Sequence, residues 1–339
     1  MLRKALLTSV CALALALAGC GGGFSPGEDD LVVYSGREEE LVGPLIERFE
    51  EETGIEVAVR YANSSELAAT LAEEGGNSPA DVFWAQDPGA LGAVEAEGRF
   101  AELPQTVLDR VPERFRDPDG TWTGVSGRVR VIAYNTDEVA ESEVPDRIDD
   151  VADERWRGGI GIAPPNASFQ AFVSAMRLDR GDEATREWLD AVKANEPRFY
   201  ENNIAILEAL AEGEIEIGLV NHYYLALIKS EDPDAPVENH FLASGDDGAL
   251  ISVAGAGVID GSDKQEQAER FVEFLLSETG QRFYAEETEE AEYPLVEGIE
   301  PRAGLPPLDS LEGPDVELDQ LGEELETTLE MLAEAGYTT

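Results

Sequence analysis

Short apolar strands alternate with amphipathic helices along most of this chain, and this alternation constrains the fold more than any other feature. Residues 31–34 form an apolar strand, and residues 38–53 carry apolar side chains at the 3.6-residue period of a helix. Gly54 follows that helix as a C-terminal glycine should. Residues 55–61 then alternate apolar and polar side chains, as a second strand does. Strands separated by helices predict an α/β fold.

The same pattern continues to the C-terminus. We predict further strands at 81–85, 128–134, 158–162, 215–220 and 249–259. We predict further helices at 65–74, from residue 88, and at 169–178, 183–194, 204–211, 265–276 and 318–335, with a loop-rich region at 110–124. The strands at 129–134 and 251–258 bracket a block of about one domain's length. They predict a chain that leaves one lobe, builds a second and returns; a single sheet containing both strands is the alternative.

The N-terminus has the features of an export signal. A basic start is followed by an apolar run from Ala5 to Ala18 and by Gly19 and Cys20. This run is shorter than the ~20 residues that a membrane-spanning helix needs. Residues 17–20 resemble a bacterial lipoprotein box, which implies cleavage before Cys20 and a lipid on its thiol; an ordinary signal peptide is the alternative. Residues 20–30 are rich in glycine and acidic residues and predict a flexible tether.

Composition disfavours several classes of function. The chain has two cysteines, Cys11 and Cys20, and two histidines, His222 and His240. A mature domain that starts at Cys20 has little to offer a zinc enzyme or a Ser-His-Asp hydrolase. A net charge of −48 disfavours nucleic acid as a partner, because phosphate backbones would be repelled. We interpret the dispersed acidic residues as an adaptation to a salty environment; a field that gathers cations is the alternative.

Two adjacent phenols, Tyr223 and Tyr224, follow the apolar strand at 215–220. A phenol ordinarily has a pKa near ~10, so it binds as phenolate only when a strong competitor such as a trivalent cation displaces its proton. Oxygen donors suit hard ions such as Fe(III). Neighbouring side chains of a strand point to opposite faces, so both rings can reach one ion only if the backbone turns there. One ring in the core and one on the surface is the alternative.

Several dispersed segments give the chain its family resemblance. It resembles the ferric-ion-binding periplasmic proteins of bacterial ABC importers, members of the type II periplasmic binding proteins, from Leu31 to about Gly336. The segments that carry the resemblance are 33–37, 78–83, 126–131, 166–170, 220–224, 257–258, 268–276 and 292–295.

The resemblance implies a two-lobed fold, each lobe a mixed sheet flanked by helices, with hinge strands between the lobes. Residues 31–128 and 253–304 would form the N-terminal lobe, and residues 129–252 and 305–339 the C-terminal lobe. Residues 1–19 would be the lipoprotein signal and 20–30 the tether. The resemblance further implies a monomeric, lipid-anchored extracytoplasmic receptor, not an enzyme, that delivers Fe(III) to a permease and its ATPase.

The resemblance also assigns residues to the iron site. Tyr223 and Tyr224 match the family's paired iron ligands. Glu38 and Gln86 stand where some members have a ligand histidine and a ligand glutamate. Glu38 would be a carboxylate ligand or simply favourable in the first turn of its helix. Gln86 is a poor ligand for Fe(III), and hydrogen bonding to a ligand suits it better.

A synergistic anion, phosphate or carbonate, would complete the iron's coordination. The residues that match the anion site are Asn166, Ala167, Ser168, Asn203 and Asn221. Asn166 and Ser168 begin the helix at 169–178, whose free N–H groups attract an anion; Asn166 as a helix cap is compatible with this role. Arg37 and Arg128 are further candidates for contact with the anion.

Two other classes of function remain open from the sequence. A binding protein of this shape could take another small ligand: a polyamine, thiamine or an oxyanion. An extracytoplasmic enzyme is disfavoured because the sequence offers no evident nucleophile with a neighbouring base.

Overall fold

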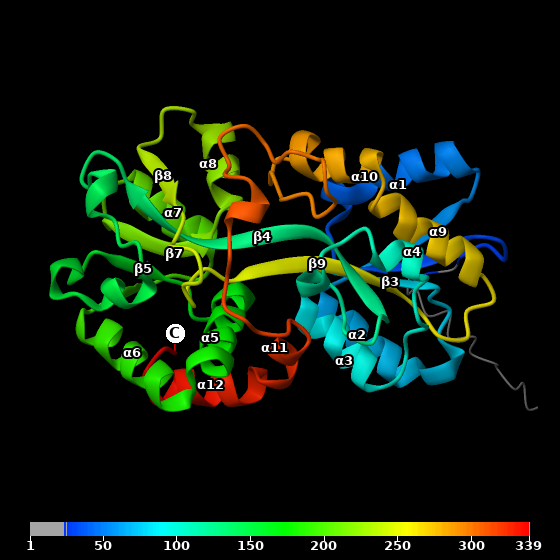
Figure 1. Cartoon of the computed structure of the whole chain (residues 1–339), viewed down its shortest axis with the longest axis horizontal. Coiled ribbons are helices and arrows are strands. Elements are labelled where there is room, and N and C mark those ends of the chain that lie inside the picture. The colour runs from blue at the N-terminus through cyan, green and yellow to red at the C-terminus, as the bar shows by residue number, and fades with distance from the viewer. Residues whose placement is uncertain (1–23, 25, 339) are drawn as a thin grey trace, which may run out of the picture.

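Two lobes lie side by side in the computed structural model, joined by two long strands that run from one lobe into the other (Figure 1). The structure describes Phe24 and residues 26–338. The predicted signal at 1–19 and the predicted lipid attachment at Cys20 lie outside the described residues. Within the described part, no helix is long and apolar enough to cross a membrane.

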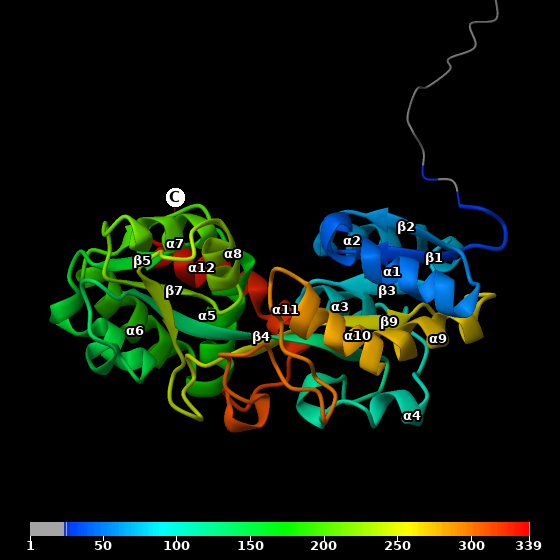
Figure 2. The ribbon, with the colours of Figure 1, turned by 90° about the horizontal axis from the view of Figure 1, so that it is seen from above.

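The first lobe is built on a mixed sheet in the order β2-β1-β3-β9-β4. Its strands are β1 (Leu31–Ser35), β2 (Val57–Tyr61), β3 (Val82–Ala85), β9 (Ile251–Val258) and the first half of β4 (Trp122–Asn135). β1 runs parallel to β2 and β3, whereas β9 runs antiparallel to β3 and β4. Helices cover this sheet as seen from above in Figure 2. They are α1 (Glu39–Thr53), α2 (Ser64–Glu74), α3 (Pro88–Ala96), α4 (Gln105–Leu108), α9 (Gln265–Leu275) and α10 (Glu278–Arg282).

Helix α1 shows how the periodic pattern becomes packing. It buries Val42, Leu45, Ile46 and Phe49, the stripe expected from the sequence, and Gly54 caps it in the left-handed conformation (φ 70°). Each fully buried side chain of this kind contributes about 1.5–3 kcal/mol. The stripe therefore fixes which face of the helix meets the sheet.

The second lobe continues the sheet through β7, β5 and β6, with β8 paired to β4. Its elements are β5 (Ile160–Ile162), α5 (Ala167–Arg180), α6 (Asp182–Ala194), β6 (Arg198–Phe199), α7 (Asn203–Ala211), β7 (Ile217–Asn221), α8 (Tyr224–Glu231) and β8 (Val237–His240). The nine strands form one hydrogen-bonded sheet, as the alternative of a single sheet requires, with eight strands on a continuous path and β8 paired to β4 beside it. That sheet nevertheless spans two lobes (Figure 1).

Strand β4 changes partners in its middle. From Trp122 to Val129 it pairs with β9, and from Arg130 to Asn135 it pairs with β7 and β8. The exchange falls beside the predicted boundary between residues 128 and 129, which stays a prediction. β4 starts at Trp122, earlier than the predicted 128–134. The prediction missed this start because Gly124 and Gly127 interrupt the apolar pattern of the strand. A side chain at Gly124 would meet the carbonyl oxygen of Phe115 at 2.7 Å. Close packing therefore requires glycine here, and this glycine makes the strand hard to recognise in the sequence.

The C-terminal segment touches both lobes. The predicted helix at 318–335 is in fact two helices, α11 (Gln320–Glu323) and α12 (Leu325–Glu334). α12 packs on α5 of the second lobe, whereas α11 packs mainly on α3 of the first lobe. Gly322 and Gly89 allow this approach, since a side chain at Gly322 would lie 2.6 Å from the Gly89 carbonyl oxygen.

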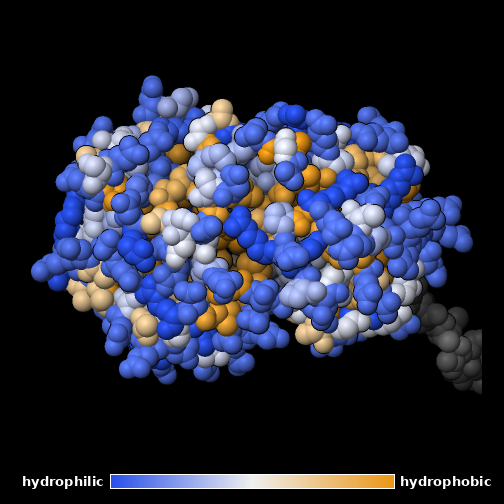
Figure 3. Space-filling model, viewed as in Figure 1, coloured by the Kyte–Doolittle hydropathy of each residue, from blue (hydrophilic) through white to orange (hydrophobic). Residues whose placement is uncertain are grey.

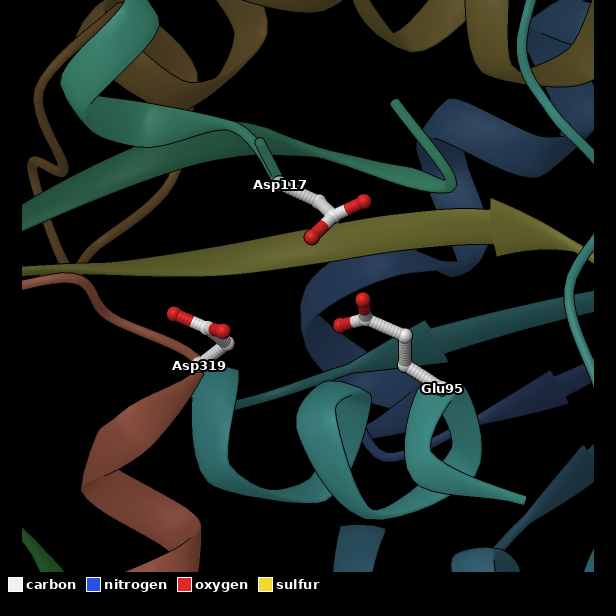
Figure 4. A group of neighbouring side chains, drawn as sticks. All are labelled: Glu95, Asp117 and Asp319. Carbon is white, nitrogen blue, oxygen red and sulfur yellow. The ribbon is translucent and has the colours of Figure 1, made fainter. Parts of the chain in front are cut away.

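Three carboxylates meet where α11 approaches the first lobe (Figure 4). Glu95 on α3, Asp117 and Asp319 bring carboxylate oxygens within 4.8 Å of one another. None of the three forms an ion pair with a basic side chain in the described part of the chain. Burial, with the charge of Asp117 second, raises the pKa of Glu95 to about 7. The indole N–H of Trp122 donates to Glu95 at 3.2 Å.

Hydrophilic residues cover most of the face shown in Figure 3, and hydrophobic residues show mainly toward its middle. The chain carries a net charge of −48, and a charge of this size and sign repels polyanions.

Candidate functional site

A cavity of about 630 Å³ lies between the two lobes. The first lobe lines it with the two residues that follow β3 and with α2 and α3; the second lobe lines it with the starts of α5 and α8. Its polar lining includes Gln86, Asp87, Arg128, Arg130, Asn166, Ser168, Asn221, Tyr223 and Tyr224. The cavity thus collects much of the predicted iron and anion site in one place.

The tyrosine pair lies at a backbone turn. β7 ends at Asn221 and α8 begins at Tyr224, so Tyr223 already has helical backbone angles (φ −70°, ψ −23°). The two ring centroids are 4.2 Å apart, and both rings line the cavity. A backbone turn at this position is what two neighbouring phenols need in order to reach one ion. Burial, with Tyr224 second, raises the pKa of Tyr223 well above its ordinary value, so it is a neutral phenol until a cation displaces the proton.

His222 holds the turn before Tyr223 in place through two hydrogen bonds to backbone groups on the side away from the cavity. Its Nδ1 accepts a hydrogen bond from the backbone N–H of Val129 (3.2 Å), and its Nε2 donates to the carbonyl oxygen of Ala291 (3.1 Å). Burial lowers the pKa of His222 to about 4, so the ring is neutral and this pattern is consistent. His222 points away from the cavity, toward the position where β4 exchanges its partners.

The predicted anion residues form a connected group at the start of α5. Asn166 caps α5 by accepting from the Ser168 N–H (3.0 Å) and from the Ser168 hydroxyl (2.6 Å). Asn203 donates to Asn166 Oδ1 and Ser168 Oγ, both at 3.2 Å. The side-chain oxygen of Asn203, Oδ1, is buried without a hydrogen-bond partner among the described residues. Ala167 and Asn221 line the cavity beside them.

Arg130, which the sequence analysis did not single out, is the buried cation of this group. Its guanidinium donates to Ser168 Oγ (3.0 Å), Asn221 Oδ1 (3.3 Å) and the Leu219 carbonyl (2.8 Å). No carboxylate in the described part of the chain pairs with it. Burial lowers the pKa of Arg130 to about 10, so it stays charged at neutral pH. A usable signal existed: Arg130 lies two residues after Arg128 and therefore on the same strand face.

Arg128 and Arg37 share a buried carboxylate. Arg128 Nε donates to Glu292 (2.8 Å), and Arg37 donates to Glu292 (2.9 Å) and Glu290 (3.3 Å). Burial alone would raise the pKa of Glu292, but the two arginines lower it to about 2. Arg37 does not line the cavity, whereas Arg128 does, and Arg128 Nη2 is buried without a partner. Of these two candidates, the geometry leaves only Arg128 able to meet an anion.

Of the two residues predicted in the first lobe, Gln86 lines the cavity and Glu38 does not. Glu38 is exposed before α1, makes no capping hydrogen bond and lies outside the cavity lining. Gln86 lines the cavity, with its backbone N–H held by Ser64 Oγ (2.8 Å) and its carbonyl bound by Arg128. Asp87, beside it, also lines the cavity and caps α3 by accepting from the Ala90 N–H (3.0 Å).

Comparison with known families gives a match over most of the chain. The model for bacterial extracellular solute-binding proteins matches residues 77–307. The Fe(3+)-binding periplasmic protein of Serratia marcescens is 32% identical over 339 residues, covering 99% of each chain. The iron uptake protein A1 of Synechocystis is 33% identical and covers 92% of this chain and 89% of its own.

Solved structures agree in fold. Iron-bound HitA from Pseudomonas aeruginosa superposes with a TM-score of 0.81 at 31% identity, covering 91% of this chain and 99% of its own. The Trichodesmium protein IdiA (FutA), solved with iron and citrate, gives a TM-score of 0.82 at 27% identity, covering 91% and 100%. The predicted type II periplasmic-binding-protein fold is thereby confirmed.

Proposed function

Because the chain belongs to the bacterial extracellular solute-binding proteins, we propose that it binds Fe(III) in the cavity between its lobes and delivers the ion to an ABC importer. The single observation that carries this proposal is the pair of phenols 4.2 Å apart at a turn that faces the cavity. The relatives named above as iron proteins support the choice of ion.

The chemistry of the donors suits a trivalent cation. Tyr223 and Tyr224 would bind as phenolates, because Fe(III) competes for the oxygen where a proton otherwise stays. Two phenolates leave the ion with net positive charge and open coordination positions. A cation such as a polyamine fits less well, since Arg128 and Arg130 face the same cavity.

A synergistic phosphate or carbonate would fill part of the remaining positions. Asn166, Ser168, Asn221 and the start of α5 line the part of the cavity where it would lie. Asn203 is buried outside the lining and supports Asn166 and Ser168 through hydrogen bonds. Arg130 supplies a fixed positive charge there without a carboxylate to neutralise it. The buried Arg128 Nη2, a donor without a hydrogen-bond partner among the described residues, further supports an anion here.

Binding would proceed by closure of the lobes about β4 and β9. We propose residues 31–128 and 253–304 as one moving body and 129–252 and 305–339 as the other, with α11 as the part of the C-terminal segment that follows the first lobe. Closure excludes water and strengthens each charge interaction at the ion. The closed form would dock on the permease, and a lipid on Cys20 would keep the receptor at the membrane.

Colour tests the metal assignment directly. Tyrosinate-bound Fe(III) absorbs in the visible, so the ferric-loaded protein should be coloured, and the band should be lost with a strong chelator and in Tyr223→Phe. Tyr134→Phe, which alters a phenol on β4 outside the cavity lining, is the matched control. A wild-type protein that stays colourless after ferric loading would refute the proposal, and calorimetry against polyamines and thiamine would then follow.

The anion site has its own test. Asn166→Ala and Asn203→Ala should each weaken iron retention while the protein stays folded by circular dichroism. Iron dissociation from the wild-type protein should also differ between phosphate and carbonate buffer. Equal rates in both buffers, together with unaffected alanine variants, would count against this site.

A further inference from the structure

We propose that Asp87 is the carboxylate with which the first lobe binds the ion held by Tyr223 and Tyr224 of the second lobe. This inference rests on the proposed function and names the side chain through which the first lobe would contact the bound ion. Gln86 and Glu38, the residues that the resemblance points to, leave that role open.

Position in the cavity singles out Asp87. In the part of the chain that the structure describes, Asp87 and Glu97 are the carboxylates that line the same cavity as the tyrosine pair. Glu97 follows the last turn of α3, ten residues and about 15 Å along the helix from Asp87 at 1.5 Å per residue. Asp87 instead adjoins Gln86, whose carbonyl is bound by Arg128 beside the cavity.

The backbone around Asp87 is held on three sides. Ser64 Oγ accepts from the Gln86 N–H (2.8 Å), the Gly36 N–H donates to the Trp84 carbonyl (2.8 Å), and α3 starts directly after Asp87 at Pro88. The capping bond from the Ala90 N–H occupies one carboxylate oxygen. A carboxylate has about four lone-pair positions, so capping leaves Asp87 able to bind a cation.

The charge of Asp87 lacks a direct partner. No lysine or arginine in the described residues forms an ion pair with it, and Arg128 is already bound to Glu292 at 2.8 Å. Burial raises the pKa of Asp87, and the hydrogen bond from the Ala90 N–H and the more distant charge of Arg128 offset this only in part. A carboxylate that is desolvated without a neutralising side chain is stabilised by a bound cation.

The charges then balance at the ion. Two phenolates and the Asp87 carboxylate carry three negative charges, which neutralise Fe(III). The anion's charge is left to face Arg130 and the free Nη2 of Arg128. Gln86 cannot contribute to this balance, because its side chain is neutral.

Asp87→Asn tests the assignment without removing the helix cap, since asparagine caps helices as well as aspartate does. Asp153→Asn is the matched control: Asp153 caps a short helix through the Arg155 N–H (2.9 Å) and does not line the cavity. Wild type, both variants, Glu97→Gln, Glu38→Gln and Gln86→Ala would be loaded with ferric citrate in phosphate buffer. Transfer of iron to excess EDTA would be followed through the visible band, and lobe closure through small-angle X-ray scattering.

We expect Asp87→Asn to retain the visible band, because both phenolates remain, but to lose iron about 10- to 100-fold faster than wild type. Iron should contract the wild-type protein and Asp153→Asn in solution, and it should contract Asp87→Asn less. Asp87→Asn with wild-type kinetics, or faster loss in Glu97→Gln, Glu38→Gln or Gln86→Ala alone, would overturn the role of Asp87 and leave the tyrosine site standing. A wild-type protein without an iron band would overturn the proposed function and this inference with it.

Discussion

Glu95→Gln should stabilise the protein at alkaline pH and have little effect at pH 5. Glu95 faces Asp117 and Asp319 without a basic partner in the described residues, and its pKa is raised to about 7 from an ordinary 4.5. Between pH 4.5 and 7 the folded state therefore holds a proton that the unfolded state has released. The free energy of unfolding therefore falls as the pH rises from 4.5 to 7, and above 7 the carboxylate is ionised beside its acidic neighbours.

The size of the effect follows from those two pKa values. They correspond to at most about 3.4 kcal/mol, at 1.36 kcal/mol per pKa unit. Glu95 is only partly buried and keeps contact with water, which screens the repulsion, so we expect about half of this, roughly 1–2 kcal/mol, at pH 8.5. Glutamine keeps the acceptor for the Trp122 indole N–H and removes the charge.

Urea unfolding of Glu95→Gln and wild type at pH 5 and pH 8.5 measures this difference. Glu97→Gln, an exposed change at the end of the same helix, controls for the general loss of one negative charge from an acidic protein. The reasoning is refuted if the two proteins differ by the same free energy of unfolding at both pH values. It is also refuted if the variant is the less stable one at pH 8.5.

Three further substitutions test the buried polar groups around the cavity. Glu292→Gln leaves Arg37 and Arg128 without their shared charge and should lower the free energy of unfolding by about 3–5 kcal/mol; an unchanged urea midpoint would contradict this. Arg130→Met should speed iron loss by about tenfold or more and make the rate insensitive to phosphate, whereas a rate that still responds to phosphate would show that the anion lies elsewhere. His222→Phe leaves two buried backbone groups unpaired and should cost about 1–3 kcal/mol for each, with His222→Asn losing less; calorimetry that ranks the two variants the other way would argue against the hydrogen bonds.

Local features were predictable because their causes are local. The buried stripe and left-handed Gly54 of α1, and the Asn166 cap of α5, follow from periodicity and capping rules that act within a few residues. The same rules predicted one helix at 318–335, yet the structure has two. The break at Glu324 occurs because α11 packs on α3 while α12 packs on α5, and no pattern within the segment reports that division.

The sequence by itself determined the α/β class, the tyrosine pair and the need for a turn beside it, because these depend on neighbours along the chain. Only the tertiary structure decided what faces that pair. Glu38, prominent in the sequence, lies outside the cavity, whereas Asp87 and Arg130 line it. The chain crosses between the lobes through β4 and β9 and again in the C-terminal segment. Side chains from distant segments meet only when those strands pair in their observed register.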